Sequence, residues 1–452
     1  MQPYPGSGES GVDWIGDIPA RWVVKRLKFV ATANDDALSD GEEPLRPVSY
    51  VDISSVDSAL GITQVEEMVF EDAPSRARRL VRHGDTIVST VRTYLRAIAP
   101  IADPPSTMVV STGFAVIRPR DLDPGFSAWA LRAHGFVEEI VARSVGVSYP
   151  AINASEIGNI RIAVPPLDEQ RDIAAFLDRE TERIDSLIAK KRLLIERLQE
   201  YRTALITRTV TRGLPPEAAR AAGLAPAPRL KPSGVEWLGD VPDHWNVGLL
   251  KRWFRIVNGG TPRSGEDAFW DGEIVWLTPD DLGSNQTMWI SAGNRKLTVE
   301  GLERCSARLC PTGSIALSTR APIGHVALTA APSATNQGCR TLVPEAEIDS
   351  EFAYFIILAA RSVLESLGQG STFMELSQGD LGRLRLAKPQ LDEQRTLVKF
   401  LNRETEKVAR LITRAEVAIR RLQEYRTALI TAAVTGKIDA RDEASVTEDL
   451  VE

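Results

Sequence analysis

The two halves of the chain share one framework, and this internal repeat constrains the fold more than any other feature. Segments around Trp14, Leu167 and Leu198 return 223 to 224 residues later, around Trp237, Leu391 and Leu422. Residues 198–207 return without change as residues 422–431. Between these matching frames, residues from about 30 to 145 barely resemble residues from about 255 to 368. Each half is therefore a shared frame around a variable insert, which predicts one architecture with two different surfaces.

A long helix is predicted in each frame. Residues 168–211 contain no Pro or Gly and space apolar side chains at three, four and seven positions, as an amphipathic helix does. Asp168 is the expected N-cap, and the two helices should end at Gly213 and Gly436. A lone helix with an apolar stripe is unstable in water, so we expect the two to pack as an antiparallel coiled coil. The expected packing positions are Ile184, Ile188, Ile195, Leu198, Leu205, Val408, Ile412, Leu422 and Leu429.

The predicted fold class is α+β, with two mixed α/β domains, here called heads, each followed by a long helix. The expected segments are head 1 (1–165), helix (166–212), Pro-rich linker (213–232), head 2 (233–389), helix (390–436) and acidic tail (437–452). Strands are predicted at 86–90, 114–117, 160–164, 274–277, 315–318 and 385–386, buried helices at 129–131 and 352–358, and a short linker helix at 216–222.

Charge weighs against binding to a duplex, which is driven largely by phosphate neutralisation, because the net charge is −7. The charge is uneven, however: six arginines lie between residues 76 and 96, where only Asp85 opposes them. Loop residues of both inserts also suit DNA, since Arg reads guanine, Asn and Gln read adenine, and hydroxyl groups hold phosphates. The candidate DNA-contacting residues are Arg76, Arg79, Arg92, Thr93, Tyr94, Ser148 and Tyr149 in head 1, and Thr261, Arg263, Arg320, Asn336, Gln337, Ser371 and Thr372 in head 2.

No motif for catalysis is found: the sequence has no Walker loop, zinc-protease helix, nucleophile elbow or methyltransferase cofactor loop. Residues 6–11 match the dinucleotide pattern by letter but follow no predicted strand, so we expect a flexible leader. The three cysteines, Cys305, Cys310 and Cys339, are expected to be idle thiols, with no metal site. The four histidines have no evident carboxylate companions in the sequence. With no signal peptide and no apolar run long enough for a membrane span, a cytoplasmic location is expected.

The frame motifs resemble the specificity subunits of Type I restriction-modification enzymes (HsdS). The motifs are Trp-Ile-Gly-Asp-Ile-Pro with a following Trp, Pro-Pro-Leu-Asp-Glu-Gln at the start of the long helix, and Leu-Gln-Glu-Tyr-Arg-Thr-Ala-Leu-Ile at its end. Gly259-Gly-Thr-Pro262 with Trp270 and Trp276-Leu-Thr278 also resembles a target-recognition domain of that family. The resemblance covers residues from about 10 to 436.

The resemblance implies two target-recognition domains that read the two halves of a split DNA target. Because the inserts differ, the two half-sites should differ and the target should not be a palindrome. The helices would be a spacer and would dock two methyltransferase subunits (HsdM-type), which bind S-adenosylmethionine. Two motor-nuclease subunits (HsdR-type), which use ATP and Mg²⁺, would join them, and this chain would bind no cofactor. The alternatives are a coiled-coil scaffold that reads no DNA, and an autonomous nuclease or methyltransferase.

Overall fold

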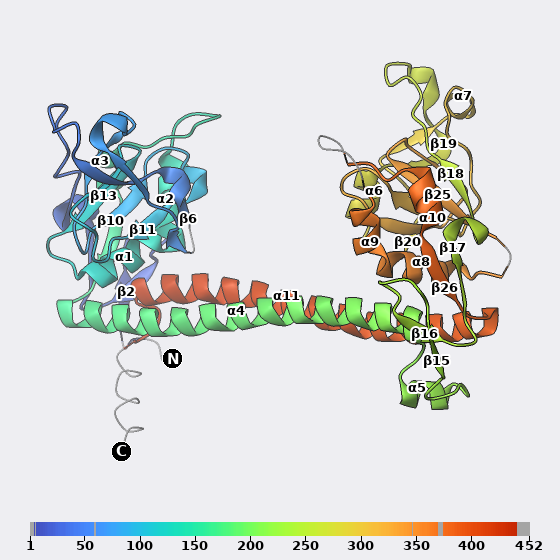
Figure 1. Cartoon of the computed structure of the whole chain (residues 1–452). Coiled ribbons are helices and arrows are strands. Elements are labelled where there is room, and N and C mark those ends of the chain that lie inside the picture. Colours follow the sequence, from blue (N-terminus) through green and yellow to red (C-terminus); the bar gives the residue numbers. More distant parts are fainter. Residues whose placement is uncertain (1–3, 5, 58–59, 346, 369–373, 441–452) are drawn as a thin grey trace. The chain divides into compact units, whose positions relative to one another are not determined.

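The structure, a computed structural model, describes residues 4, 6–57, 60–345, 347–368 and 374–440 (Figure 1). The chain folds into two units: unit 1 comprises residues 1–192 and 416–452, and unit 2 comprises residues 193–415. Each unit holds one head and parts of both long helices, α4 (Leu167–Arg212) and α11 (Leu391–Val434). The expected mixed α/β domains, each followed by a long helix, are thereby confirmed.

Head 1 is built on two four-stranded sheets, with orders β11-β10-β13-β4 and β8-β5-β12-β9. Their strands are β4 (Ala31–Ala33), β5 (Pro47–Val51), β8 (Glu66–Val69), β9 (Ala77–Leu80), β10 (Thr86–Ser89), β11 (Ile98–Pro100), β12 (Met108–Ser111) and β13 (Phe114–Pro119). Smaller pairs are β1 (Ser7–Glu9) with β2 (Asp17–Pro19), β3 (Val23–Arg26) with β14 (Arg161–Val164), and β6 (Val56–Asp57) with β7 (Gly61–Ile62). The helices are α1 (Pro124–Arg132), α2 (His134–Arg143) and α3 (Ala154–Asn159). Within these ladders only β5 and β12 pair parallel among the described residues.

Head 2 has a five-stranded sheet of order β18-β25-β22-β23-β20 and a three-stranded sheet of order β21-β19-β24. Their strands are β18 (Phe254–Asn258), β19 (Trp270–Leu277), β20 (Trp289–Ile290), β21 (Arg295–Leu297), β22 (Ile315–Ser318), β23 (Val326–Thr329), β24 (Ser333–Thr335) and β25 (Cys339–Pro344). Two further pairs join β15 (Leu230–Pro232) to β16 (Asp240–Pro242) and β17 (Asn246–Leu249) to β26 (Arg385–Lys388). The helices of this unit are α5 (Pro216–Ala221), α6 (Pro279–Ser284), α7 (Val299–Glu303), α8 (Ser350–Ala359), α9 (Arg361–Ser366) and α10 (Gln378–Arg383).

The repeated Leu-Asp-Glu-Gln motif fastens each long helix to its head. In unit 1, the buried Glu169 carboxylate accepts a 2.7 Å hydrogen bond from Trp22 Nε1, and Gln170 Oε1 accepts one from the backbone N–H of Asp123. In unit 2, the same contacts join Glu393 to Trp245 and Gln394 to Asp349. Buried polar groups need such partners, so this motif has a structural role in both units.

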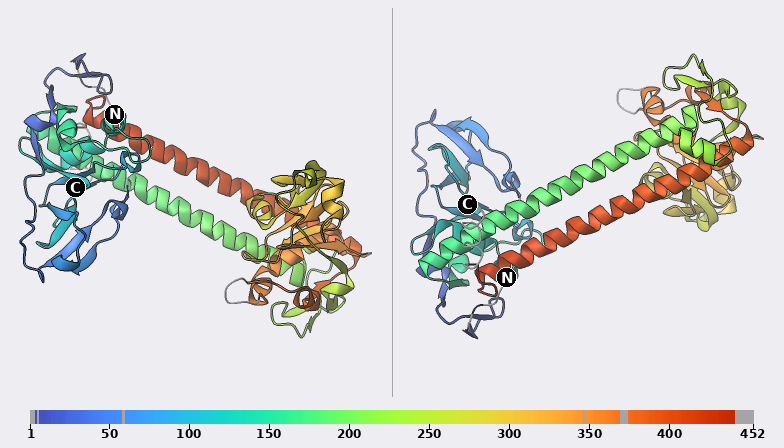
Figure 2. Two further views of the ribbon diagram at one scale, coloured as in Figure 1. Left: turned by 90° about the horizontal axis from the view of Figure 1, so that it is seen from above. Right: turned by 90° about the horizontal axis from the view of Figure 1, so that it is seen from below.

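The two long helices pack against each other within each unit. In unit 1, Arg426 Nε donates to Asp185 Oδ1 at 3.0 Å, and Trp22, which binds Glu169, also contacts the Gly436 turn. In unit 2, Trp245 lies near both Glu393 and Gly213. The start of one helix therefore lies beside the end of the other, which makes the packing antiparallel in both units, and Figure 2 shows the helices side by side from two further directions.

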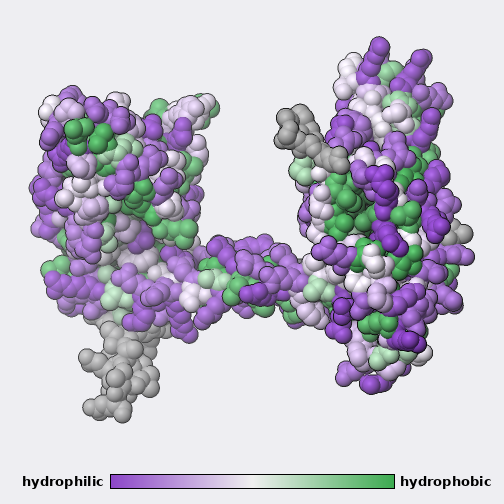
Figure 3. All heavy atoms as spheres, in the orientation of Figure 1, coloured by the Kyte–Doolittle hydropathy of each residue, from purple (hydrophilic) through white to green (hydrophobic). Residues whose placement is uncertain are grey.

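The expected packing positions of the helices fall into two groups. Ile184, Ile188, Val408 and Leu429 are buried, whereas Ile195, Leu198, Leu205, Ile412 and Leu422 are partly buried. Other apolar residues of the stripe stay exposed: Leu187, Leu194, Tyr201, Leu411 and Tyr425. Figure 3 shows such hydrophobic residues among hydrophilic ones along the helices.

Most predicted elements of the inserts are confirmed. The predicted strands correspond to β10, β13, β14, β19, β22 and β26, and the predicted buried helices to α1 and α8. The short helix of the linker is α5.

Two local expectations are wrong. Residues 6–11 are not a flexible leader, because Ser7–Glu9 forms β1 and pairs antiparallel with β2. Asp168 is not the N-cap of α4, because the helix already begins at Leu167 and Asp168 lies in its first turn. A carboxylate there still interacts favourably with the helix dipole.

Candidate nucleic-acid interface and docking grooves

An exposed arginine and an exposed tyrosine lie together at the surface of head 1. Arg92 precedes a short 3-10 turn (Thr93–Leu95) and adopts a left-handed backbone conformation with φ of 52°. Its guanidinium lies 5.3 Å from the ring centroid of Tyr149, whose side chain is 68% exposed. Tyr94 and Ser148 are also exposed beside these two residues in the sequence. The predicted residues Arg92, Tyr94, Ser148 and Tyr149 therefore lie on two adjacent, accessible loops.

The two loops are fixed by a set of hydrogen bonds, which we call the clamp of head 1. Thr90 donates to the Gly113 carbonyl through both its backbone N–H and its hydroxyl, at 2.8 Å each. Its own carbonyl accepts from the Ile152 N–H at 2.8 Å. Thr93 is buried and its hydroxyl bonds to Ser144 at 2.8 Å, so Thr93 supports the loop and does not face a ligand.

The same clamp recurs in head 2, although the inserts differ in sequence. Thr319 donates to the Gly338 carbonyl through its N–H at 2.8 Å and its hydroxyl at 3.3 Å. The Thr319 carbonyl accepts from the Leu376 N–H at 2.8 Å. The short sequence match that ends at Thr90 and Thr319 is thus explained by a shared support for two different loops.

Head 2 gathers most of its predicted residues around this clamp. Exposed Arg320 follows Thr319 and pairs with Glu375 at 3.1 Å. Thr261 donates a hydrogen bond to the exposed Gln337 side chain, and Asn336 Oδ1 accepts from the Gly338 N–H at 2.9 Å. Arg263 is exposed on the same loop as Thr261. Ser371 and Thr372 lie outside the residues that the structure describes.

An arginine that the sequence did not single out lies behind Arg320. Arg340 donates to the Thr319 hydroxyl at 2.9 Å, and its Nη2 lies 3.8 Å from Glu375 Oε1. Burial lowers the pKa of Arg340, and its buried Nε has no hydrogen-bond partner among the described residues. Arg340 and Arg320 therefore share one carboxylate at the edge of the clamp. No motif in the sequence identifies Arg340 as a site residue. Its one distinguishing feature is its position next to Cys339 on the buried strand β25.

The arginine cluster of head 1 is less cationic than its sequence suggests. Acids from distant segments pair with it: Arg76 with Asp52, Arg78 with Asp40, Arg82 with Asp36, and Arg96 with Glu138. Arg79 is partly buried in β9, with a buried Nε that has no partner among the described residues. In the described part of the chain, Arg92 is the exposed member of this cluster that forms no ion pair. The expectation that only Asp85 opposes the cluster is wrong, because Asp85 instead pairs with Arg118.

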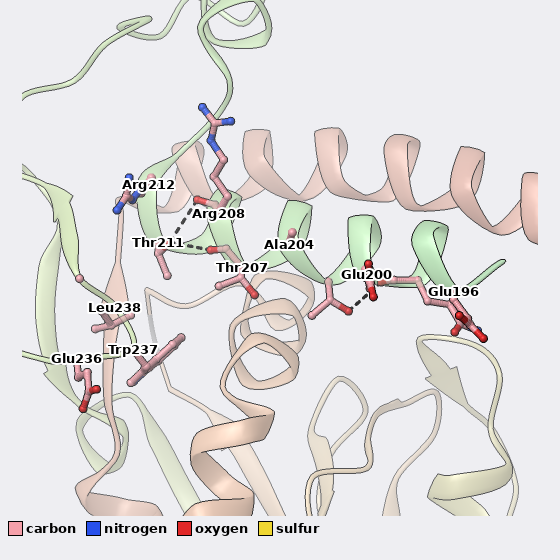
Figure 4. Close-up of a pocket in the computed structure, with 13 residues that line it drawn as sticks. Glu196, Glu200, Ala204, Thr207, Arg208, Thr211, Arg212, Glu236, Trp237 and Leu238 are labelled. Atoms are coloured by element: carbon pink, nitrogen blue, oxygen red, sulfur yellow. Dashed lines mark hydrogen bonds between the residues drawn. The ribbon is translucent and has the colours of Figure 1, made fainter. Parts of the chain in front are cut away.

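The repeated end of each long helix lines a groove, and the two grooves have equivalent walls. The groove of unit 2 has a volume of about 1110 Å³ and lies between α4 and the loop that carries Trp237 (Figure 4). The groove of unit 1 has a volume of about 720 Å³ and lies between α11 and Trp14. Equivalent lining pairs are Gln199 and Gln423, Glu200 and Glu424, Thr203 and Thr427, Ala204 and Ala428, Thr207 and Thr431, Thr211 and Thr435, and Trp237 and Trp14.

The walls of both grooves present small apolar groups. The hydroxyls of Thr211 and Thr435 donate to carbonyls one turn earlier in their own helices, at 2.7 Å each. A threonine bonded in this way satisfies its polar group locally, which leaves its methyl group for contact. The two grooves therefore share a wall of threonine and alanine side chains.

No group of three or more His, Cys, Asp or Glu residues that could hold a metal occurs in the described part of the chain. All three cysteines are free, and burial raises the pKa of Cys310 and Cys339. The histidines do have acidic neighbours that the sequence did not reveal, such as Glu393 at 2.9 Å from His244. Among the described residues, no helix is both long enough and apolar enough to cross a membrane.

Comparisons with known proteins agree with this architecture. A model of the Type I restriction modification DNA specificity domain matches residues 55–197 and 242–417, well over half of the chain. The MjaIX specificity subunit of Methanocaldococcus jannaschii is 34% identical over 36% of this chain and 39% of its own length. The HindI specificity subunit of Haemophilus influenzae is 22% identical over 94% of this chain and 100% of its own length.

Solved structures give the same result for the fold. A chain from a study of assembly and conformational transition of the type I R-M system has a TM-score of 0.75 and 23% identity, covering 93% of this chain and 99% of that one. The HsdS subunit of Thermoanaerobacter tengcongensis has a TM-score of 0.56 and 23% identity, covering 93% and 98%. With the family model matched in both halves, the chain belongs to the family of Type I restriction-modification specificity subunits.

Proposed function

We propose that this specificity subunit reads a bipartite, non-palindromic duplex target, with one half-site for each head. The loops around Arg92 would read one half-site, and the loops around Arg320 and Gln337 would read the other. The observation that carries the proposal is the recurring clamp, which supports exposed loops of unlike sequence in the two heads. A shared support with different loops is what two readers of different sequences require.

The exposed groups suit the chemistry of base edges. An arginine can bind guanine O6 and N7 through two parallel hydrogen bonds, and a glutamine can do the same with adenine N6 and N7. Arg92 is held by its backbone and by Tyr149, so less freedom is lost on binding. Arg76, Arg79 and Arg263 would then contact phosphates, which position a protein on the duplex without reading its sequence.

We further propose that the two grooves dock two methyltransferase subunits. Two equivalent surfaces suit two copies of one partner. The partner would bind S-adenosylmethionine and transfer the methyl group, and two motor-nuclease subunits with ATP and Mg²⁺ would complete the restriction enzyme. The chain itself would supply recognition and no catalysis, in the cytoplasm.

The test is a gel shift of the chain with its methyltransferase subunit against a pool of random duplexes. We expect enrichment of one bipartite sequence. Arg92→Ala should relax selection in one half-site and Arg320→Ala in the other, while partner binding remains. If the methyltransferase subunit binds but no DNA sequence is enriched, the chain is a scaffold and the DNA-reading proposal is wrong.

A second assay addresses catalysis. The chain alone, incubated with duplex DNA and S-adenosylmethionine or with duplex DNA, ATP and Mg²⁺, should neither transfer a methyl group nor cut a strand. Either product would show that the chain is an enzyme in its own right.

A further inference from the structure

A small pocket in unit 1 gathers three arginines and a histidine. It has a volume of about 160 Å³ and is lined by Arg96, Ile98, Arg132, His134, Val137, Arg426, Thr427 and Ile430. These four side chains come from the loop before β11, from α1, from α2 and from α11. We call this site the arginine pocket.

Arg132 is the cation of this pocket that is least neutralised. Arg96 pairs with Glu138 at 2.6 Å and Arg426 with Asp185 at 3.0 Å. Arg132 instead stacks on Trp129, with 3.8 Å from its guanidinium carbon to the ring centroid, and donates from Nε to the Ala128 carbonyl. Among the described residues, Arg132 forms no ion pair.

The surroundings of Arg132 disfavour its charge. Burial, together with the nearby charge of Arg426, lowers the pKa of Arg132 to about 10, although Asp178 and Asp185 offset part of this. Two guanidinium groups near one indole ring, Arg132 and Arg426, repel each other where water screens them poorly. An anion between them would relieve this repulsion and give the Arg132 terminal nitrogens an acceptor.

The pocket is continuous with the docking groove of unit 1. His134 and Thr427 line both of them. A side chain of a segment that docks in this groove can therefore reach Arg132 and Arg426. The volume of the pocket admits one small group, such as a carboxylate.

The equivalent place in unit 2 lacks a counterpart of Arg132. The N-cap residues Asp123 of α1 and Asp349 of α8 are equivalent, because each N–H donates to the glutamine of its long helix. From this alignment Leu358 replaces Arg132, and Arg202 is the counterpart of Arg426. Arg361, which begins α9 and lies beside Glu365, corresponds to His134, which begins α2 and lies beside Glu138. The arginine pocket therefore distinguishes two docking grooves that are otherwise equivalent.

We propose that the arginine pocket binds one oxyanion, a carboxylate carried by the protein partner that docks in the groove of unit 1. The assignment of the carboxylate to a docked partner rests on the proposed docking function, whereas the binding of an oxyanion by the pocket does not. It follows that the two grooves bind the same partner with unequal strength, and that the groove of unit 1 is filled first.

The pocket is tested with sulfate as the probe and the isolated full chain. Thermal unfolding is followed as sulfate replaces chloride at constant ionic strength. We expect a saturable rise of Tm, and about tenfold weaker apparent sulfate binding in both Arg132→Met and Arg426→Gln, since charge-assisted hydrogen bonds are lost. The matched control Arg202→Gln should bind sulfate like the unchanged chain. The proposed oxyanion site would be overturned if the Tm of the wild-type chain showed no saturable rise with sulfate, or if all variants bound sulfate equally well.

The source of the oxyanion is tested by titrating the chain with its methyltransferase subunit in a calorimeter. Arg426→Gln should weaken one of the two binding events about tenfold, sulfate should compete with that same event, and Arg202→Gln should leave both unchanged. If Arg426→Gln loses sulfate binding but leaves both binding events of the methyltransferase subunit unchanged, this partner does not supply the carboxylate.

Three further outcomes would also contradict the proposal that the docked partner supplies the oxyanion. Weaker duplex binding by Arg132→Met, with unchanged partner binding, would identify a DNA phosphate as the ligand. Tighter sulfate binding after removal of residues 441–452 would identify the acidic end of the chain. Complete absence of partner binding in the wild-type chain would remove the docking function and leave the sulfate result standing.

Discussion

At the scale of single residues, Arg92 is the arginine between residues 76 and 96 that is exposed and forms no ion pair in the described part of the chain. Its arginine neighbours in the sequence pair with Asp36, Asp40, Asp52 and Glu138, whereas Arg92 contacts the Tyr149 ring. Its left-handed backbone costs about 1–3 kcal/mol, which the clamp around Thr90 must offset. Strain of this kind is found where a side chain must be aimed.

Arg92→Lys tests whether this side chain reads a base. The charge stays, so the salt dependence of DNA binding should change little. The planar fork is lost, so discrimination at one base pair should fall by about 1–3 kcal/mol. Binding of the cognate duplex and of single-substituted duplexes measures both effects, with Arg143→Lys on α2 as the control. Equal loss on every sequence would show that Arg92 contacts only phosphate.

Asp52 should make head 1 sensitive to acid. Burial raises the pKa of this carboxyl, but hydrogen bonds from Tyr50 and Ser54 and the charge of Arg76 outweigh it, and the pKa lies below its ordinary value. A lowered pKa stabilises the fold above the ordinary pKa, and this stabilisation is lost as the pH falls through the folded value.

We therefore expect Asp52→Asn to lower Tm at neutral pH and to reduce the fall of Tm below about pH 4. Thermal unfolding across this pH range gives the comparison, with exposed Asp13→Asn as the control. An unchanged acid dependence in Asp52→Asn would mean that other carboxylates cause it.

At the scale of elements, the two long helices end in glycines that are equivalent in sequence but differ in surroundings. Both have positive φ, 81° at Gly213 and 71° at Gly436. A Cβ on Gly213 would meet nothing closer than Trp245 at 3.9 Å, whereas a Cβ on Gly436 would lie 2.3 Å from Pro19.

Gly213→Ala should cost about 1 kcal/mol through backbone strain alone. Gly436→Ala should cost at least about 1 kcal/mol more, because the Pro19 ring must move. Urea unfolding of the two variants checks the order. Equal losses would show that the Pro19 turn yields easily.

The elements were predictable from the sequence because their signals are local. Apolar periodicity and the glycine after each helix predict α4 and α11, and β-branched runs predict strands such as β10 and β22. The pairing of Arg76 with Asp52 was not predictable, since it joins a turn residue just before β9 to a residue just after β5. The pairing of β1 with β2 was missed because β1 is only three residues long. The groove of unit 1 and the arginine pocket were missed because each combines segments that lie far apart in the sequence, such as Trp14 with residues 420–437.

At the scale of the whole molecule, α4 and α11 each contribute residues to both units. Deleting residues 189–195 of α4 together with the matching residues 413–419 of α11 removes one heptad, about 10 Å of helix. The permitted gap between half-sites should change by about three base pairs, or recognition should be lost. The bases preferred in each half-site should stay the same, as selection from random duplexes will show. A changed base preference with an unchanged gap would refute the spacer role.

Methylation-sensitive sequencing of DNA shows whether each head reads one half of a split target. The host would express the chain with its methyltransferase subunit, as wild type, Arg92→Ala or Arg320→Ala. We expect one bipartite, non-palindromic methylated motif, with only one half relaxed in each variant and a different half in each. A continuous motif, or relaxation of both halves by either substitution, would contradict it.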